Sequence, residues 1–349
     1  MHIIILADDV GSKLWPVTSE TSPKALLQVY SEASLLEETL SRMLPVTEGG
    51  QNVIIVTVDK AIPTLLQQKT LEMYGIPKSN ILTVPEPKGS AWSMWEAIRF
   101  MIDIKEVPLD ESVIVVPSDQ FMWPKELAMF HFFNLAARIR SNPDEFTCVC
   151  LTPGGPSPGM NYLYGDLQEV STMGIPYEDT MLGTVSTLHV DIDGYQALPD
   201  LDSAKDLVAN SWMWDLHSYG ATLSTFDHYL KKLLKAKVSQ IAKWGSLEST
   251  HFSSVIPDIL EDRKLHGALI PKIAWSTLDN WVSIKHLLYD SGLFQPTGQS
   301  GVQSIESSGN LIFKPPNKTI ALYGVTDLIV IDVGDKLLIG TSEGLHEYF

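Results

Sequence analysis

Short apolar runs rich in β-branched residues recur along the first 150 residues of the chain. They cover residues 3–6, 53–58, 81–84, 113–116 and 147–151. None of them alternates between apolar and polar positions, which is the pattern of strands covered on both faces. Segments with helical spacing of apolar residues lie between them, as at 93–102 and at 126–141. The alternation predicts an α/β fold with a mostly parallel, doubly wound sheet.

The pattern changes in the second half of the chain. Residues 152–165 are rich in Gly and Pro, which predicts a loop beside the ligand face of the sheet. A Gly-, Ser- and Gln-rich stretch at 297–310 is typical of a linker, and the segments 319–324 and 328–339 beyond it predict β-strands. We therefore expect a first domain over 1–296, a linker over 297–310 and a small C-terminal β domain over 311–349. The last is too short to fold well alone and should dock on the first.

The composition and net charge limit the kinds of molecule that the chain can bind. The 349 residues are 44% hydrophobic and 19% charged, which indicates a globular chain. A net charge of −17 argues against binding to nucleic acid or to an anionic membrane surface, because these require clustered Lys and Arg. The two cysteines cannot form a disulfide framework, and the N-terminal apolar run is too short for a signal peptide or a membrane span. We expect a cytoplasmic protein.

The candidate chemistry begins directly after the first apolar run. Residues 6–16 read Leu-Ala-Asp-Asp-Val-Gly-Ser-Lys-Leu-Trp-Pro, and Pro23-Lys24 follows. A loop after the first strand lies at the carboxyl edge of an open α/β sheet, where such sheets bind ligands. This segment resembles the Ala-Gly-Gly-x-Gly-Thr-Arg-Leu loop and the following Pro-Lys of sugar nucleotidyltransferases, and the match is identical or conservative from Gly11 onward. The Trp-Pro pair resembles that of the mannose-1-phosphate guanylyltransferases in particular.

Further similarities to this family follow in the same order along the chain. Residues 115–120 resemble the Leu-Pro-Ala-Asp-His segment, residues 86–91 the segment ending Arg-Asn-Thr-Ala, and residues 158–163 the Thr-Gly-Tyr-Gly-Tyr-Ile of the sugar pocket. Residues 275–281 resemble Trp-Ser-Asp-Val-Gly-Ser-Trp, and residues 323–332 resemble a β-segment of the family's tail. Because the matches keep their order over nearly the whole chain, they favour the family over a chance loop.

The resemblance implies a fold, a reaction and partners. The fold would be a Rossmann-like, GT-A type nucleotidyltransferase domain with a β-helix-like C-terminal domain. The reaction would join mannose 1-phosphate to a nucleoside triphosphate, with GTP favoured, to give GDP-mannose and pyrophosphate in the presence of Mg²⁺. An appended β tail often supports self-association in this family, which leaves a homo-oligomer open.

The resemblance also implies residue roles. The catalytic residues would be Lys13, Lys24 and Asp119, and Mg²⁺ would be held by Asp119 and Asp279. Nucleotide binding would involve Ala7, Asp8, Asp9, Gly11, Ser12, Lys88 and Ser90. Sugar binding would involve Gly159, Asn161, Tyr162 and Asp215.

The chain departs from the family at several functional positions, among them Gly89-Ser90 in place of the base-contacting Asn-Thr. Asp8-Asp9 replaces a Gly-Gly pair, and a carboxylate about 4 Å from a phosphate charge costs roughly 4 kcal/mol at an effective dielectric near 20. Thr277 stands where the family has its second metal-binding aspartate, two residues before Asp279. Three interpretations stay open: the active family enzyme, a catalytically weak or inactive regulatory or assembly subunit, and an enzyme for another sugar 1-phosphate or nucleotide. The first is narrowly favoured.

Overall fold

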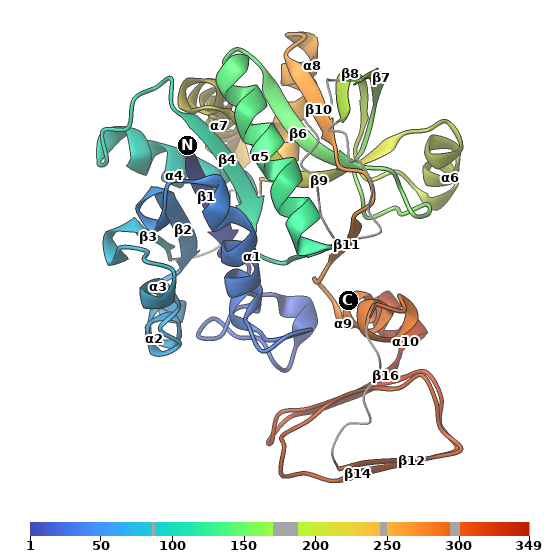
Figure 1. Cartoon of the computed structure of the whole chain (residues 1–349). Helices are drawn as coiled ribbons and strands as arrows, with labels where there is room; N and C mark the ends of the chain where they lie inside the picture. The colour runs from blue at the N-terminus through green and yellow to red at the C-terminus, as the bar shows by residue number, and fades with distance from the viewer. Residues whose placement is uncertain (86–87, 170–187, 245–249, 294–300, 349) are drawn as a thin grey trace, which may run out of the picture.

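A nine-stranded sheet forms the centre of the molecule (Figure 1). The structure is a computed structural model that describes residues 1–85, 88–169, 188–244, 250–293 and 301–348. Across the sheet the strands follow the order β3 (Ile81–Val84), β2 (Val53–Val58), β1 (His2–Ala7), β4 (Ser112–Pro117), β9 (Met213–Thr222), β6 (Phe146–Leu151), β10 (Leu265–Leu269), β8 (Leu188–Gln196) and β7 (Tyr162–Glu169).

Seven of these nine strands run in the same direction. The strands β1 to β4 are mutually parallel, and β6 and β10 are parallel to each other. Strand β9 is antiparallel to β4, β6 and β7, and β8 is antiparallel to β10 and β7, so only β8 and β9 are reversed. The predicted mostly parallel α/β sheet is confirmed. The carboxyl ends of most strands therefore lie at one edge, where ligands bind in such folds.

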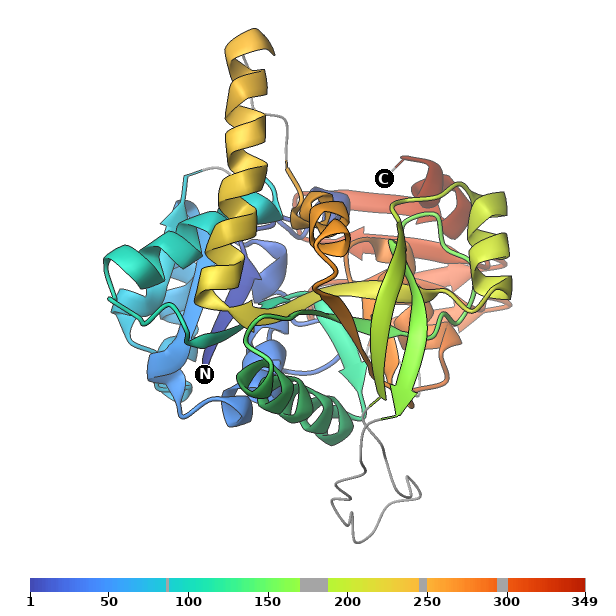
Figure 2. The same cartoon turned by 90° about the horizontal axis from the view of Figure 1, so that it is seen from above.

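Helices cover both faces of the sheet (Figure 2). Helices α1 (Leu35–Met43) and α5 (Lys125–Ser141) pack together on one face, and α4 (Ser90–Asp103) and α7 (Leu223–Trp244) pack together on the other. The other helices of this domain are α2 (Ile62–Gln67), α3 (Thr70–Met73), α6 (Leu201–Ala209), α8 (Ile256–Glu261) and α9 (Trp281–Lys285). A two-stranded ribbon of β5 (Gln120–Trp123) and β11 (Ala274–Thr277) extends from the sheet edge.

The strands and helices follow from the sequence. Strand β2 is buried at all six positions and β4 at its first five, which explains their uninterrupted apolar runs. Helix α4 buries Met94, Ile98 and Met101, which share one face at three-and-four spacing. Among the helices that the structure describes, none is long and apolar enough to cross a membrane.

The C-terminal region is a short β-helix. Strand β12 (Val302–Ile305) stacks parallel on β14 (Ile320–Tyr323), and β13 (Leu311–Phe313) stacks parallel on β15 (Leu328–Asp332). The paired residues are 18 apart in each case, as in 302 with 320, 308 with 326 and 311 with 329. The antiparallel β16 (Leu337–Thr341) and α10 (Ser342–Tyr348) close the region. The β-helix-like tail is thereby confirmed.

Two predicted boundaries differ from the structure. Strand β12 falls inside the predicted linker 297–310, so the residues from 301 onward belong to the first coil of the β-helix, while 297–300 lie outside the described residues. Gly301 and Gly309, at φ 75° and 64°, serve as turn positions of that coil, which explains a linker-like composition. The predicted loop 152–165 likewise ends earlier, because β7 begins at Tyr162.

The tail docks on the first domain, as the sequence predicts. Leu311, Ile329 and Ile331 of the tail share a buried cluster with residues of α9 and of the loop after β1, namely Trp281, Ile284, Leu14 and Leu27. The Lys285 ammonium bonds Asp327 across the same contact at 2.6 Å. Trp281 Nε1 also donates a hydrogen bond to the carbonyl of Trp15 at 2.9 Å. The β-helix therefore supports the loop that carries the candidate chemistry.

Candidate active site

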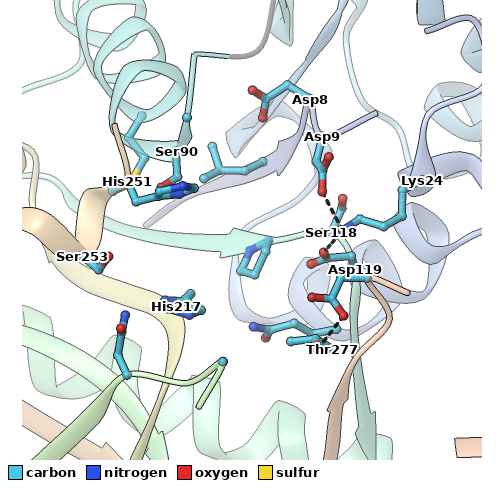
Figure 3. Close-up of a pocket in the computed structure, with 18 of the residues that line it drawn as sticks. Asp8, Asp9, Lys24, Ser90, Ser118, Asp119, His217, His251, Ser253 and Thr277 are labelled. Carbon is cyan, nitrogen blue, oxygen red and sulfur yellow. Dashed lines mark hydrogen bonds and ion pairs between the residues drawn. The ribbon is translucent and has the colours of Figure 1, made fainter. Parts of the chain in front are cut away.

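A cavity of about 570 Å³ opens at the carboxyl edge of the sheet (Figure 3). Its walls come from segments that follow β1 and β4, from the start of α4, from β9, from the turn before β7 and from the end of β11. This is the edge at which the sequence predicts a ligand site. Charged side chains from the segments after β1, β4 and β11 gather at one part of it.

Lys24 is the cation of the cavity. It lies in the 3₁₀ turn η2 (Lys24–Leu26) with 2% of its surface exposed. Its Nζ lies 2.7 Å from Asp9 Oδ2 and 2.5 Å from Asp119 Oδ2 (Figure 3). Burial acts to lower the pKa of Lys24, but the two carboxylates outweigh it and raise that pKa above its usual value. Lys24 is therefore a permanent positive charge with two negative partners.

The two aspartates that replace glycines are held differently. Asp8 is 7% exposed, and its Oδ2 accepts a hydrogen bond from Ser93 Oγ of α4 at 2.6 Å. Burial raises the pKa of Asp8, and the bond from Ser93 offsets only part of that rise. The side chain of Asp9 is 67% exposed. Enclosure by the cavity acts to raise its pKa, but Lys24 and the backbone N–H of Gly11 together lower it. Lys24 and Gly11 thus favour the ionised form of Asp9, whereas burial disfavours the ionised form of Asp8.

The loop backbone brings Asp9 and Lys24 together. Asp9 Oδ1 accepts the N–H of Gly11 at 2.8 Å, and the N–H of Lys24 donates to the carbonyl of Val10 at 3.2 Å. Gly11 has φ 77°, and a Cβ placed on it would lie 2.8 Å from the Cβ of Lys24. A glycine is therefore required here by both the left-handed backbone and the close approach of Lys24.

Asp119 and Asp279 both line the cavity from neighbouring segments. Gln120 pairs with Thr277 in the β5–β11 ribbon, and the N–H of Leu278 donates to the carbonyl of Asp119 at 3.1 Å. Thr277 Oγ1 donates to Asp279 Oδ1 at 3.1 Å, so the threonine orients the carboxylate two residues on.

The donor set at this position suits Mg²⁺. Carboxylate oxygens are its preferred protein ligands, and it commonly takes one or two of them beside water and substrate phosphate. Within the described residues there is no cluster of three or more His, Cys, Asp or Glu side chains that could enclose a metal by themselves. With Asp119 and Asp279 as its protein ligands, a Mg²⁺ ion would need water and a phosphate ligand to complete its coordination.

About half of the residues that the sequence singles out meet at this cavity. Those that line it are Asp8, Asp9, Lys24, Ser90, Asp119, Gly159, Asn161 and Asp279. Those that do not line it are Ala7, Gly11, Ser12, Lys13, Lys88, Tyr162 and Asp215. Lys13 is exposed on the 3₁₀ turn η1 (Ser12–Leu14), and the Lys88 ammonium lies over the ring of Trp92, 5.3 Å from its centroid. Their roles toward a nucleotide stay predictions.

Two of the residues expected to bind the sugar are structural instead. Tyr162 is fully buried, and its hydroxyl donates to the carbonyl of Ser157 at 3.1 Å, which fixes the turn before β7. Asp215 is also fully buried. Its Oδ1 accepts the backbone N–H of His217 at 2.9 Å, and its Oδ2 accepts the hydroxyl of Tyr219 at 3.0 Å. Neither side chain reaches the cavity, because each is used to position its neighbours.

Four polar lining residues lie outside every motif that the sequence analysis singles out: His217, Tyr219, His251 and Ser253. His217 lies in β9 with φ 54°, next to an irregularity in the β6–β9 pairing, so simple alternation does not show which way it points. His251 and Ser253 are brought to the cavity because the N–H of Phe252 donates to Ser90 Oγ at 2.9 Å. No local pattern in the sequence indicates that long-range contact.

Comparison with known proteins agrees with the fold. The nucleotidyl transferase family model matches residues 2–149. The xanthan biosynthesis protein XanB of Xanthomonas campestris pv. campestris (strain B100) is 22% identical over 99% of this chain and 71% of its own length. A mannose-1-phosphate guanylyltransferase of Escherichia coli is 21% identical over 97% of this chain and 70% of its own length.

A solved structure shares the whole architecture. The mannose-1-phosphate geranyltransferase from Thermus thermophilus superposes with a TM-score of 0.73 at 18% identity, and the match covers 99% of this chain and 96% of that one. At this identity the likeness concerns the fold, including the β tail. The family match covers the loop after β1, Lys24 and Asp119, so residues 2–149 are similar to the nucleotidyl transferase family, and the whole chain has the fold of the Thermus structure.

Proposed function

We propose that the chain is a sugar-1-phosphate nucleotidyltransferase that converts mannose 1-phosphate and GTP to GDP-mannose and pyrophosphate. The observation that carries the proposal is the buried Lys24 ammonium, in contact with Asp119 at the edge of the sheet that binds ligands. The names of relatives that match nearly the whole chain favour mannose and guanine over other sugars and bases. The choice of mannose and guanine rests on relatives that are 22% and 21% identical to this chain.

The reaction requires alignment and charge neutralisation more than a protein nucleophile. An oxygen of the sugar phosphate attacks the α-phosphorus of the triphosphate, and pyrophosphate leaves. In our proposal Lys24 contacts a phosphate group at the reacting end, and Asp119 and Asp279 hold Mg²⁺. When bound, the ion neutralises phosphate charge as it develops. Asn161, 3% exposed in the wall of the cavity, would orient the sugar.

The domain division is part of the same proposal. Residues 1–296 would contain the whole reaction site, and the tail, counted from Val302, would support the loop after β1. Trp281 and Leu14 lie at that contact. Self-association of the chain stays a prediction, which light scattering on the purified protein can measure.

A specific observation supports the alternative of a weak or regulatory subunit. Asp9 already neutralises Lys24, so a phosphate has to compete with a carboxylate of this chain for the same ammonium. A protein in that state would bind nucleotides poorly and would act through its fold or through a partner. The competition between Asp9 and a phosphate does not depend on which sugar carries the phosphate. The third interpretation, an enzyme for a different sugar 1-phosphate or nucleotide, is therefore tested in the same experiment.

The deciding experiment measures pyrophosphate release with Mg²⁺ for each nucleoside triphosphate, paired with mannose 1-phosphate and with glucose 1-phosphate. Lys24→Ala and the milder Lys24→Gln remove the cation. Lys205→Ala is the matched control, because Lys205 is an exposed lysine paired with Asp202 on α6. Release with GTP and mannose 1-phosphate alone, lost in both Lys24 variants and kept in the control, establishes the proposal. No release from folded wild-type protein favours the regulatory subunit.

A further inference from the structure

His217 is held in an unusual backbone conformation at the cavity wall. It lies within β9 with φ 54°, a left-handed conformation that residues other than glycine seldom adopt. The N–H of His217 donates to Asp215 Oδ1 at 2.9 Å, and this bond to a fully buried carboxylate stabilises the conformation. Strained backbone held in place by its surroundings is concentrated at binding and catalytic sites. The strand is therefore distorted at the residue that turns its side chain to the cavity.

A chain of hydrogen bonds fixes the imidazole of His217. Burial and Asp215 raise the pKa of Tyr219 well above its usual value, so its hydroxyl stays protonated and donates to Asp215 Oδ2 at 3.0 Å. The oxygen of that hydroxyl is 3.3 Å from His217 Nδ1 and can only accept, so Nδ1 carries the proton. In a neutral imidazole the other nitrogen, Nε2, is then an acceptor.

The surroundings of His217 differ from those of Lys24. Figure 3 shows His217 together with Ser253 and His251 on one side of the cavity, and Lys24 with Asp9 and Asp119 on the other. Asn161, which is buried, also lines the cavity. One part of the cavity thus has a lysine and two aspartates, and the other has histidine, serine and asparagine side chains that can form hydrogen bonds. A ligand with a phosphate at one end and hydroxyl groups at the other matches this division.

We propose that His217 is a specificity-determining residue that accepts a hydrogen bond from a sugar hydroxyl through Nε2, with Tyr219 and Asp215 as its positioning residues. The inference rests on the proposed function and names the group that this site recognises. Because Nδ1 faces the hydroxyl of Tyr219, the neutral imidazole presents Nε2 to the cavity as an acceptor, and a sugar hydroxyl is a donor that can bond it. In this proposal His217 contacts the sugar, and the buried Asp215 positions that histidine instead of binding the sugar itself.

The main variant is His217→Gly, which removes the imidazole and also relieves the left-handed backbone, so we expect it to fold as well as the wild type. Calorimetric titration with mannose 1-phosphate and with glucose 1-phosphate should show about a tenfold loss of affinity for the preferred sugar. Binding of inorganic phosphate should not change. Arg263→Gly is the matched control, since Arg263 is exposed, has φ 55° and does not line the cavity.

A second measurement reports the tautomer of His217. Nitrogen-15 NMR of the wild type should show Nδ1 protonated, and Tyr219→Phe, which removes the accepting hydroxyl, should increase the Nε2-protonated form. A purely structural role for Tyr219 would leave the tautomer unchanged. Rescue of sugar binding by His217→Asn, which tolerates the left-handed backbone and keeps an acceptor, would support the assignment further.

The outcomes separate this inference from the proposed function. Unchanged sugar affinity in His217→Gly overturns the inference, as does a loss of inorganic phosphate binding, which would make His217 an anion contact. A wild type that binds neither sugar phosphate overturns it as well. If the wild type binds mannose 1-phosphate through His217 but releases no pyrophosphate with any triphosphate, the inference stands and the transferase proposal falls.

Discussion

Asp9 should weaken the binding of phosphate ligands because its carboxylate already occupies two donors of the loop. It contacts Lys24 Nζ at 2.7 Å and the N–H of Gly11 at 2.8 Å, and both are groups that an anionic ligand would use. Asp9→Asn removes the negative charge but keeps an oxygen that can accept the N–H of Gly11. Lys24 keeps Asp119 as its partner, so the variant leaves no unpaired buried charge.

The magnitude follows from the charge and its exposure. Two like charges about 4 Å apart repel by roughly 1 kcal/mol in water and roughly 4 kcal/mol at an effective dielectric of 20. Asp9 is 67% exposed, so solvent screening places the cost toward the lower figure. A gain of about 1.4 kcal/mol corresponds to tenfold in affinity. We therefore expect Asp9→Asn to bind pyrophosphate about tenfold more tightly than the wild type.

Titration calorimetry with pyrophosphate and Mg²⁺ measures this directly, without requiring turnover. Asp8→Asn is the matched control, because Asp8 also lines the cavity but is bonded to Ser93 rather than paired with Lys24. Its effect should be smaller, and the gain in Asp9→Asn should shrink in 1 M salt, where the Debye length is about 3 Å. Equal effects of the two variants, or an affinity of Asp9→Asn within twofold of the wild type, would refute the reasoning.

Three further perturbations test other parts of the structure. Gly11→Ala should destabilise the fold by about 1 to 2 kcal/mol in urea unfolding, since φ is 77° and the new Cβ meets Lys24; stability equal to wild type would contradict the required glycine. Burial lowers the pKa of His131 to about 4, so the folded state resists protonation and stability should fall as the pH drops below 6.5. The loss between pH 7 and pH 5 should be about 2 kcal/mol, and His131→Phe should reduce that slope. Lys285→Met should speed proteolysis of the tail, because Lys285 bonds Asp327 across the docking contact. That hydrogen bond lowers the pKa of Asp327, so in the wild type the contribution is present at neutral pH and is lost as the pH falls through the acidic range.

The sheet and its edge could be predicted from the sequence because their causes are local. Buried strands such as β2 require continuous apolar runs, and the loop after β1 has to lie at the carboxyl edge once the sheet is parallel. Lys24 and Asp119 follow two neighbouring parallel strands, so their meeting at the cavity follows from the same topology. The mostly parallel sheet and the position of the loop after β1 at its carboxyl edge depend only on this topology, and both agree with the structure.

The errors come from contacts that no local pattern expresses. Strand β12 is four residues long with mostly exposed side chains, and only its pairing with β14, 18 residues on, makes it a strand. The place of Asp215 in the sequence suggests a residue at the sugar, but Asp215 is fully buried and bonds the N–H of His217, whose left-handed backbone no local pattern indicates. A rule based on alternation along a strand fails at such a position, since it assumes a regular pleat.

The tail and the site are linked through one hydrophobic cluster. Leu14 and Leu27 belong to it, and they lie on either side of Lys24 in the sequence. Ile329 and Ile331 of the β-helix complete the same cluster, so the segment from Leu14 to Leu27 packs on the tail as well as on the sheet. Lys24 is buried and bonded to Asp9 and Asp119, and its position tolerates little movement of this segment. Loss of tail packing should therefore disturb Lys24 before it affects the central sheet, whose core is a separate cluster.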